Sequence, residues 1–303
     1  MRKKFFKRLG VNKLIIGIIL FIGIAETAKC AGLAVSPGGL LIQEIVPGKL
    51  YDLYEISKIG LTIYNKDNKP HTYVLSTHKP SEVGNRKWEK GYLEIPNPQW
   101  CWFDKKEIEV EANGKGFVRI YLQIPDEEKY YNQHWVVAIG VIGKTKIGLG
   151  VALGIYVRLQ IETKSKADIK EKPDGIIAFK PSTVRFKDVS LDNTRESKVV
   201  IYNNDDEIHT YRITSLFHIK GVERKNYLTH LYEAIPDTRW ISLSKSKVRI
   251  NPGQFYTLFL KLRIPNDPEY YGRKWEDILL VQPDKGLPGF IRVQIETRKA
   301  NVD

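Results

Sequence analysis

Apolar and polar residues alternate along most of this chain, which is the pattern of half-buried β-strands. The clearest example is VRIYLQI at residues 118–124, bounded by Asn-Gly before it and by Ile-Pro around its end. After the first thirty residues, no stretch shows a sustained helical period with capping residues. The pattern therefore predicts an all-β protein.

Similar short apolar segments, separated by turn residues, follow one another through the first half of the chain. Roughly seven strands in about 130 residues are typical of a two-sheet sandwich of immunoglobulin type. The expected strands are 33–36, 40–46, 59–65, 71–77, 92–95, 108–111, 117–124, 135–142 and 155–163.

This pattern occurs twice. The motifs of residues 95–135, from Ile-Pro through Trp100 to Trp135, return 140 residues later at 235–275. Tyr-Asn and His-Thr-Tyr return at an offset of 138, and the tetrapeptide Gln-Ile-Glu-Thr returns at an offset of 134. Nearly constant offsets with small shifts in loops indicate a duplicated domain. We therefore predict two tandem immunoglobulin-like β-sandwich domains. The high aromatic content of the chain is also typical of β-sheets.

The boundaries follow from composition. Residues 164–175 (KSKADIKEKPDG) are rich in charge and lack apolar periodicity, so they are expected to be a solvated connection. The predicted organisation is a signal peptide or N-terminal anchor at 1–30, domain 1 at 31–165, a charged linker at 166–175 and domain 2 at 176–303.

The N-terminus resembles an export signal. A basic segment precedes an apolar run, Leu14 to Ala25, which at twelve residues is too short to span a bilayer comfortably. Cleavage after Thr27 or after Cys30 both fit the small residues that follow. Cys30 could instead be lipidated, or the segment could remain as an uncleaved anchor. Each alternative exports the protein, so a periplasmic, cell-surface or extracellular location is expected.

The net charge and the cysteine residues limit the kinds of partner and chemistry that the sequence predicts. The net charge is +13, of which +6 belongs to residues 1–30, and the remaining +7 favours contact with acidic polymers or membrane surfaces but specifies neither. No nucleic-acid-binding motif accompanies the charge, so we predict no nucleic-acid partner. Cys101 is replaced by Ile241 in the second copy, which indicates an apolar packing position rather than a reactive thiol.

No arrangement of residues predicts catalysis. Gly143-Lys144-Thr145 resembles the end of a phosphate-binding loop, but Ala138 stands where that loop needs glycine. The acidic residues form no pair suited to acid and base chemistry. The repeated histidines fall on opposite strand faces without further ligands, and we predict no metal site. These histidines are His71, His78, His209 and His218. The expectation is a non-enzymatic protein without a cofactor.

Tryptophans and a divergent hairpin provide the candidate binding residues. The repeated tryptophans are expected to plug the ends of the cores, and Trp102, which has no counterpart in the second copy, is expected to pack. Trp88 follows Arg86 and Lys87 in a loop, where an exposed aromatic ring beside cations can grip a sugar or protein. The hairpin carrying Lys144 and Lys146 differs most between the copies and is a second candidate. The repeated tryptophans are Trp100, Trp135, Trp240 and Trp275.

These motifs together resemble bacterial extracellular immunoglobulin-like domains of the NEW3 and DUF916-type cell-surface group. The resemblance is fullest in domain 2, at Trp240, Asn251-Pro252-Gly253, Ile264-Pro265 and Tyr271-Gly272. It implies a protein that binds or scaffolds a partner at the cell envelope, either a surface protein or a wall glycan. Contact with the membrane is expected only through an uncleaved signal or a lipidated Cys30.

A more distant similarity is to periplasmic pilus or secretion chaperones of the PapD kind, which also have two such domains. That alternative implies donation of an edge strand to an incomplete subunit. The strand proposed for it carries Ile155, Val157, Leu159 and Ile161, with Arg158 or Lys164 as the basic residue of the cleft.

Overall fold

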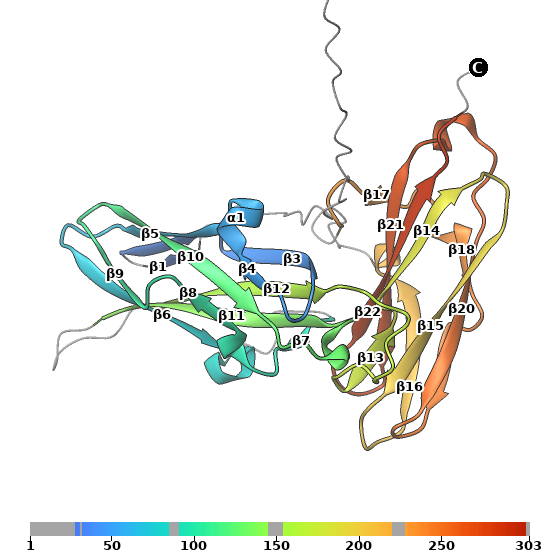
Figure 1. Cartoon of the computed structure of the whole chain (residues 1–303), viewed down its shortest axis with the longest axis horizontal. Helices are drawn as coiled ribbons and strands as arrows, with labels where there is room; N and C mark the ends of the chain where they lie inside the picture. Colours follow the sequence, from blue (N-terminus) through green and yellow to red (C-terminus); the bar gives the residue numbers. More distant parts are fainter. Residues whose placement is uncertain (1–27, 31, 85–90, 145–153, 220–227, 301–303) are drawn as a thin grey trace, which may run out of the picture.

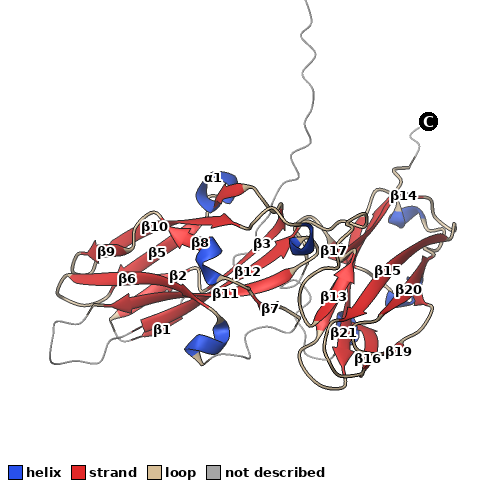
Figure 2. Cartoon of the chain, turned by 60° about the horizontal axis from the view of Figure 1, so that its bottom comes forward, coloured by secondary structure: helices blue, strands red, loops and turns tan. Residues whose placement is uncertain are grey.

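The computed structural model describes residues 28–30, 32–84, 91–144, 154–219 and 228–300. It is all-β, as predicted, and consists of two sandwiches of two sheets each (Figures 1 and 2). Among the described residues, no helix has the length and apolar character needed to cross a membrane. The predicted signal peptide, apart from Ala28–Cys30, lies outside the described residues.

Domain 1 pairs two sheets around one apolar core. The first sheet has the order β1-β2-β5-β10-β4, and β8 also pairs with β10. The second has the order β3-β12-β11-β6-β9, and β7 also pairs with β11. The strands of the first sheet are β1 (Ala28–Cys30), β2 (Leu33–Ser36), β4 (Leu50–Asp52), β5 (Gly60–Asn65), β8 (Cys101–Phe103) and β10 (Lys115–Gln123). Those of the second are β3 (Gly39–Ile45), β6 (His71–His78), β7 (Leu93–Glu94), β9 (Glu107–Val110), β11 (His134–Gly143) and β12 (Gly154–Thr163).

Domain 2 repeats the core of this topology. Its sheets have the orders β13-β15-β20-β18 and β14-β22-β21-β16-β19, with β17 beside β21. The first contains β13 (Ile177–Lys180), β15 (Arg195–Asn203), β18 (Ile241–Leu243) and β20 (Phe255–Leu262). The second contains β14 (Thr183–Val189), β16 (His209–Ser215), β17 (Glu233–Ala234), β19 (Lys247–Ile250), β21 (Lys274–Pro283) and β22 (Gly289–Thr297).

Short 3₁₀ turns close several connections, and they too recur in both domains. They are η1 (Pro80–Val83), η2 (Pro98–Trp100), η3 (Glu128–Tyr130), η4 (Leu216–His218), η6 (Thr238–Trp240) and η7 (Pro268–Tyr270). A repeated asparagine forms the same contacts in each copy. Asn65 donates from its amide to the carbonyls of Lys69 and Val110, and Asn203 donates in the same way at the equivalent place. The asparagine thus ties a turn to the edge strand, and buried carbonyls are satisfied.

The repeated tryptophans close the end of each core, as predicted. Trp100, Tyr130 and Trp135 form a cluster with ring centroids 4.9 to 5.8 Å apart. An equivalent cluster of Trp240, Tyr270 and Trp275 closes domain 2. Aromatic clusters of this geometry add to the stability gained from burial alone.

One local difference between the domains is a helix that the apolar pattern did not predict. In domain 2, the single strand β15 pairs with nearly all of β20. In domain 1, two shorter strands, β4 and β5, pair with the equivalent strand β10. Helix α1 (Leu53–Ser57) lies between these two short strands, and Asp52 caps it by accepting from the Tyr54 and Glu55 amides. Five residues are too few to show a helical period in the sequence. The capping residue Asp52 is therefore the only sequence signal for this helix.

The two domains share an apolar interface. Leu41, Tyr92 and Val136 of domain 1 belong to the same buried cluster as the core of domain 2. In Figure 1, β7 and β11 of domain 1 lie beside β13 and β22 of domain 2. Gly91, at φ +95°, lets the chain approach closely, because a Cβ there would lie 2.5 Å from the Phe290 ring. The sandwiches are therefore packed against one another rather than merely linked.

Candidate functional site

The predicted binding residues lie partly outside the described part of the chain. Arg86, Lys87, Trp88 and Lys146 lie outside the described residues, so their part in binding stays a prediction. Lys144 is described at the end of the divergent hairpin. Its ammonium group is 2.9 Å from the Glu107 carboxylate, in an exposed ion pair. Such a pair contributes little to stability and leaves Lys144 at the surface.

The strand proposed for donation to a partner is not an edge strand, and this expectation was wrong. Strand β12 lies between β11, which is antiparallel to it, and β3, which is parallel to it. Its four apolar side chains are all buried in the core. A strand that is hydrogen-bonded on both sides and fills the core cannot pair with another protein without unfolding the sheet. This excludes donation by Ile155, Val157, Leu159 and Ile161.

A buried ionic cluster joins the domains instead. Arg292 of β22 donates from Nε and Nη2 to both carboxylate oxygens of Glu162 in β12, at 2.7 and 2.6 Å. Its Nη1 donates to Glu276 of β21 at 3.0 Å. At most 6% of any of these three side chains is exposed. A bidentate guanidinium–carboxylate pair of this kind is strong and directional.

Neutral side chains satisfy the remaining carboxylate oxygens. Gln43 of β3 donates to Glu162 at 3.0 Å, and the hydroxyl of Tyr92 donates to the same carboxylate. On the other side, Thr229 donates to Glu276 from its main-chain amide and its hydroxyl, and Gln294 donates at 2.9 Å. We name the set of charged and neutral groups around Arg292 the interface cluster. Its members come from both domains, so the cluster exists only when the two domains are docked.

The electrostatics of the interface cluster follow from burial and pairing. Burial raises the pKa of Glu162, but the charge and hydrogen bonds of Arg292 lower it more, to about 2. Burial alone would lower the pKa of Arg292, but Glu162 and Glu276 raise it. Glu162 and Arg292 are therefore both charged at neutral pH. A buried charge of either sign is tolerable only while its partner remains.

Aromatic rings cover this cluster. The imidazole of His134 stacks on Phe290 with ring centroids 3.9 Å apart, and the ring of Tyr92 lies 5.2 Å from Phe290. Burial lowers the pKa of His134 to about 4, and the nearby charge of Arg292 acts in the same direction. His134 is thus neutral at physiological pH. A neutral imidazole suits a stack beside a guanidinium group.

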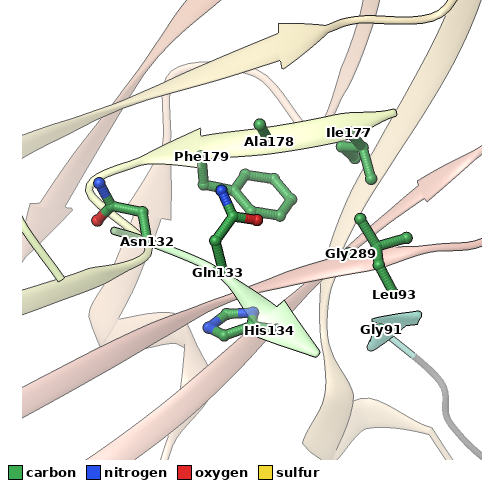
Figure 3. A pocket seen from close by; sticks show the side chains of 9 residues that line it. All are labelled: Gly91, Leu93, Asn132, Gln133, His134, Ile177, Ala178, Phe179 and Gly289. Atoms are coloured by element: carbon green, nitrogen blue, oxygen red, sulfur yellow. The ribbon is translucent and has the colours of Figure 1, made fainter. Parts of the chain in front are cut away.

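A small hollow lies at this interface. Figure 3 shows Gln133, His134 and Phe179 around it, between the start of β11 and strand β13. The hollow has room for no more than about one water molecule. This hollow is therefore too small to hold a ligand.

Asn132 of domain 1 contacts both the linker and domain 2. Asn132 donates from its amide to the Lys166 carbonyl, and its side-chain oxygen accepts from the main-chain amides of Lys166 and Ser182. Most linker residues are exposed, as expected, but Ile169 is buried. The linker therefore strengthens the contact between domains instead of acting as a free tether.

The sequence offered one indirect sign of Arg292. Arg158 was a candidate for a basic cleft, and its counterpart in the second copy is Arg292. A positively charged residue inside an otherwise apolar strand was visible in both copies. Its partners could not be identified, because Glu162 and Glu276 lie 130 and 16 residues away in the chain.

The repeated histidines are satisfied by neighbouring groups. His71 lies 2.9 Å from Asp67, and the buried His209 lies 2.9 Å from Asp205 and 3.0 Å from Asp284. The part of the chain that the structure describes contains no group of three His, Cys, Asp or Glu side chains arranged for a metal ion. Cys101 is fully buried, and burial raises its thiol pKa to about 12, which confirms the predicted packing role.

Comparisons with solved structures find similarity of fold at low sequence identity. A protein of unknown function from Porphyromonas gingivalis is 12% identical, with 88% of this chain and 99% of that one covered and a TM-score of 0.34. The Escherichia coli chaperone DraB is 10% identical, with 87% and 98% covered and a TM-score of 0.28. The seventh PapD-like domain of human CEP192 is 12% identical, with 53% and 99% covered and a TM-score of 0.28.

No protein-family model and no curated protein matches the sequence. The finer resemblance to the NEW3 and DUF916-type group therefore stays a prediction. The strand topology itself shows the two-sheet sandwich, present here in two tandem copies.

Proposed function

We propose that this chain is a non-enzymatic exported protein of the cell envelope, whose two immunoglobulin-like domains bind or scaffold a surface protein or wall polysaccharide. The observation that carries the proposal is the buried contact of Glu162, Arg292 and Glu276 between the domains. It supports a rigid two-domain body that holds surfaces of both domains at a fixed spacing.

The contact between the domains resists opening. Separating the domains would expose the apolar cluster around Tyr92 and Phe290 and would strip Arg292 from Glu162. The exposed apolar surface opposes separation, whereas the separated charges would regain water, so the ion pair fixes the geometry of the contact more than its strength. Domains that only needed a tether would be connected adequately by the linker, so the buried contact fits a role that depends on their relative position.

The envelope location rests on the sequence. The basic N-terminal segment followed by the apolar run Leu14–Ala25 has the order of an export signal. The net charge of +7 on residues 31–303 suits an environment of anionic envelope polymers. Periplasm, cell surface and medium are equally compatible with these two features.

The direct test is cross-linking of the tagged full-length chain in cells of its source, followed by fractionation and mass spectrometry of what is captured. The expected result is an envelope fraction in which wall fragments or one abundant surface protein is captured. A variant with Glu162→Gln, Arg292→Met and Glu276→Gln keeps the interface filled but removes its directional ion pairs. It should capture less partner if the fixed spacing matters.

Two other outcomes of this experiment would contradict or change the proposed function. A protein found only in the cytosol, or one that captures nothing above an untagged control, would refute the proposed function. Capture of one small secreted subunit held along a sheet edge would instead indicate a chaperone, acting through a strand other than β12. Arg298→Met with Asp188→Asn, which removes an exposed ion pair away from the interface, is the control variant.

A further inference from the structure

Domain 1 carries a shallow groove of about 420 Å³ beside the end of β8. Trp102 of β8, Gln99 of η2 and Gln123 of β10 line it, together with Asp126 in the turn that follows β10. These residues come from three neighbouring elements of one sheet edge. The groove shares no lining residue with the interface cluster and is not a part of it.

Trp102 supplies a large aromatic surface in this groove. It pairs with Tyr121 across the β8–β10 ladder, and the two rings are stacked, 5.9 Å apart at an interplanar angle of 18°. The residue is nevertheless 37% exposed. A tryptophan held in one orientation by a stacked neighbour and left open to solvent is a preorganised platform for the apolar face of a ligand. This differs from the expectation that Trp102 simply packs.

The polar side chains beside Trp102 form no hydrogen bonds within the described part of the chain. Within the described residues, the side chains of Gln99, Gln123 and Asp126 make no hydrogen bond or ion pair. Each glutamine amide offers two donors and an acceptor, and the carboxylate offers acceptors. No lysine or arginine is among the residues that line the groove, all of which are described. This chemistry fits an uncharged ligand that presents hydroxyl groups around an apolar ring face.

The second copy shows that the fold does not need these residues. Ser242 stands in the place of Trp102, and the counterparts of Gln99 and Gln123 are Arg239 and Arg263. Both arginines are paired with neighbouring aspartates, Arg239 with Asp237 at 2.7 Å and Arg263 with Asp192 at 2.8 Å. Domain 2 therefore has ion pairs where domain 1 has an open aromatic ring and free amides.

We propose that this groove binds a neutral polysaccharide, with one pyranose ring stacked on Trp102 and its hydroxyl groups hydrogen-bonded to Gln99, Gln123 and Asp126. The inference rests on the proposed envelope function and names the ligand class of that function. An aromatic platform with amide and carboxylate groups at its edge matches the alternation of apolar and hydroxylated faces on a sugar ring.

The test is isothermal titration calorimetry of the full-length chain with three neutral probes, chitotetraose, cellotetraose and laminaritetraose, and with tetragalacturonate as an anionic contrast. At least one neutral probe should bind. Trp102→Ser, which introduces the residue type of the second copy, should weaken binding about tenfold or more, as loss of an aromatic anchor typically does. Gln123→Ser should weaken it by a smaller factor.

The matched control is Arg263→Ser, at the position in domain 2 equivalent to Gln123, and it should leave the affinity unchanged. Thermal unfolding of each variant establishes that it is folded, which is expected because Trp102 is a partly exposed edge residue. Absence of binding to all neutral probes, preference for the anionic probe, or unchanged binding by Trp102→Ser would each overturn the proposal.

Envelope cross-linking with Trp102→Ser separates this proposal from the broader one. If sugars do not bind while partner capture persists, the groove assignment is wrong and the envelope function stands. If capture of a protein partner is lost without any sugar binding, the groove is a protein-docking site and the glycan assignment is wrong.

Discussion

Replacement of Arg292 with methionine should destabilise the chain by about 3–5 kcal/mol, the usual effect of removing one partner of a buried ion pair. Methionine keeps the apolar part of the side chain. What it removes is the charge that faces Glu162 and Glu276, at 2.6 and 3.0 Å. Two carboxylates would then remain buried without a cation.

The pKa of Glu162 describes the same ion pair from its acidic side. Its fall from an ordinary 4.5 to about 2 corresponds to about 3 kcal/mol of stability at neutral pH. Because this pKa is lowered by folding, the contribution is complete above about pH 4.5 and is lost as the pH falls towards 2. In the variant, burial without Arg292 favours the protonated acid, so the loss of stability should be largest at about pH 7 and smaller at about pH 4.

The assay is urea unfolding followed by tryptophan fluorescence at several pH values, with small-angle scattering to detect separation of the domains. Arg298→Met is the control, since its exposed pair with Asp188 should contribute no more than about 1 kcal/mol. Glu162→Gln and Glu276→Gln added to Arg292→Met should recover much of the lost stability, because no charge is then left buried. If Arg292→Met costs no more than Arg298→Met, the interface cluster does not hold the domains together.

Three further predictions concern single residues. Cys101→Ile introduces the residue type that domain 2 has at this position, but it adds volume at a fully buried site and should cost about 1–3 kcal/mol. The wild-type thiol should react with a disulfide reagent only after unfolding, because burial raises its pKa to about 12. Burial also raises the pKa of Asp277, so Asp277→Asn should raise the thermal midpoint at about pH 7 and have little effect near pH 3, where the acid is protonated in both states. The hydrogen bonds of Asp284 and Asp205 raise the pKa of His209, so its stabilising contribution is complete below about pH 6.5 and is lost as the pH rises through the raised pKa. His209→Gln should therefore flatten the decline of the urea midpoint between about pH 6 and 9, and an unchanged slope would contradict the assignment.

Much of the fold was predictable from the sequence because the duplication supplied the same pattern twice. Alternating positions identified the strands and which of their faces fills the core. The repeated tryptophans indicated the core ends, and the replacement of Cys101 by Ile241 indicated an apolar position. Each of these inferences depends either on residues close together in the sequence or on a comparison of the two copies. Neither requires knowledge of which strands are neighbours in a sheet.

Strand order and domain packing depended on contacts between distant residues. The alternation in β12 showed a buried face but not that β3 occupies its second edge, so the strand was wrongly proposed as a donor. Likewise, the face of β22 that carries Phe290, Arg292 and Gln294 has the alternation of a solvent-exposed face. Only tertiary packing places Glu162 against this face. The alternation of side chains along a strand determines which residues share a face, but it contains no information about what covers that face.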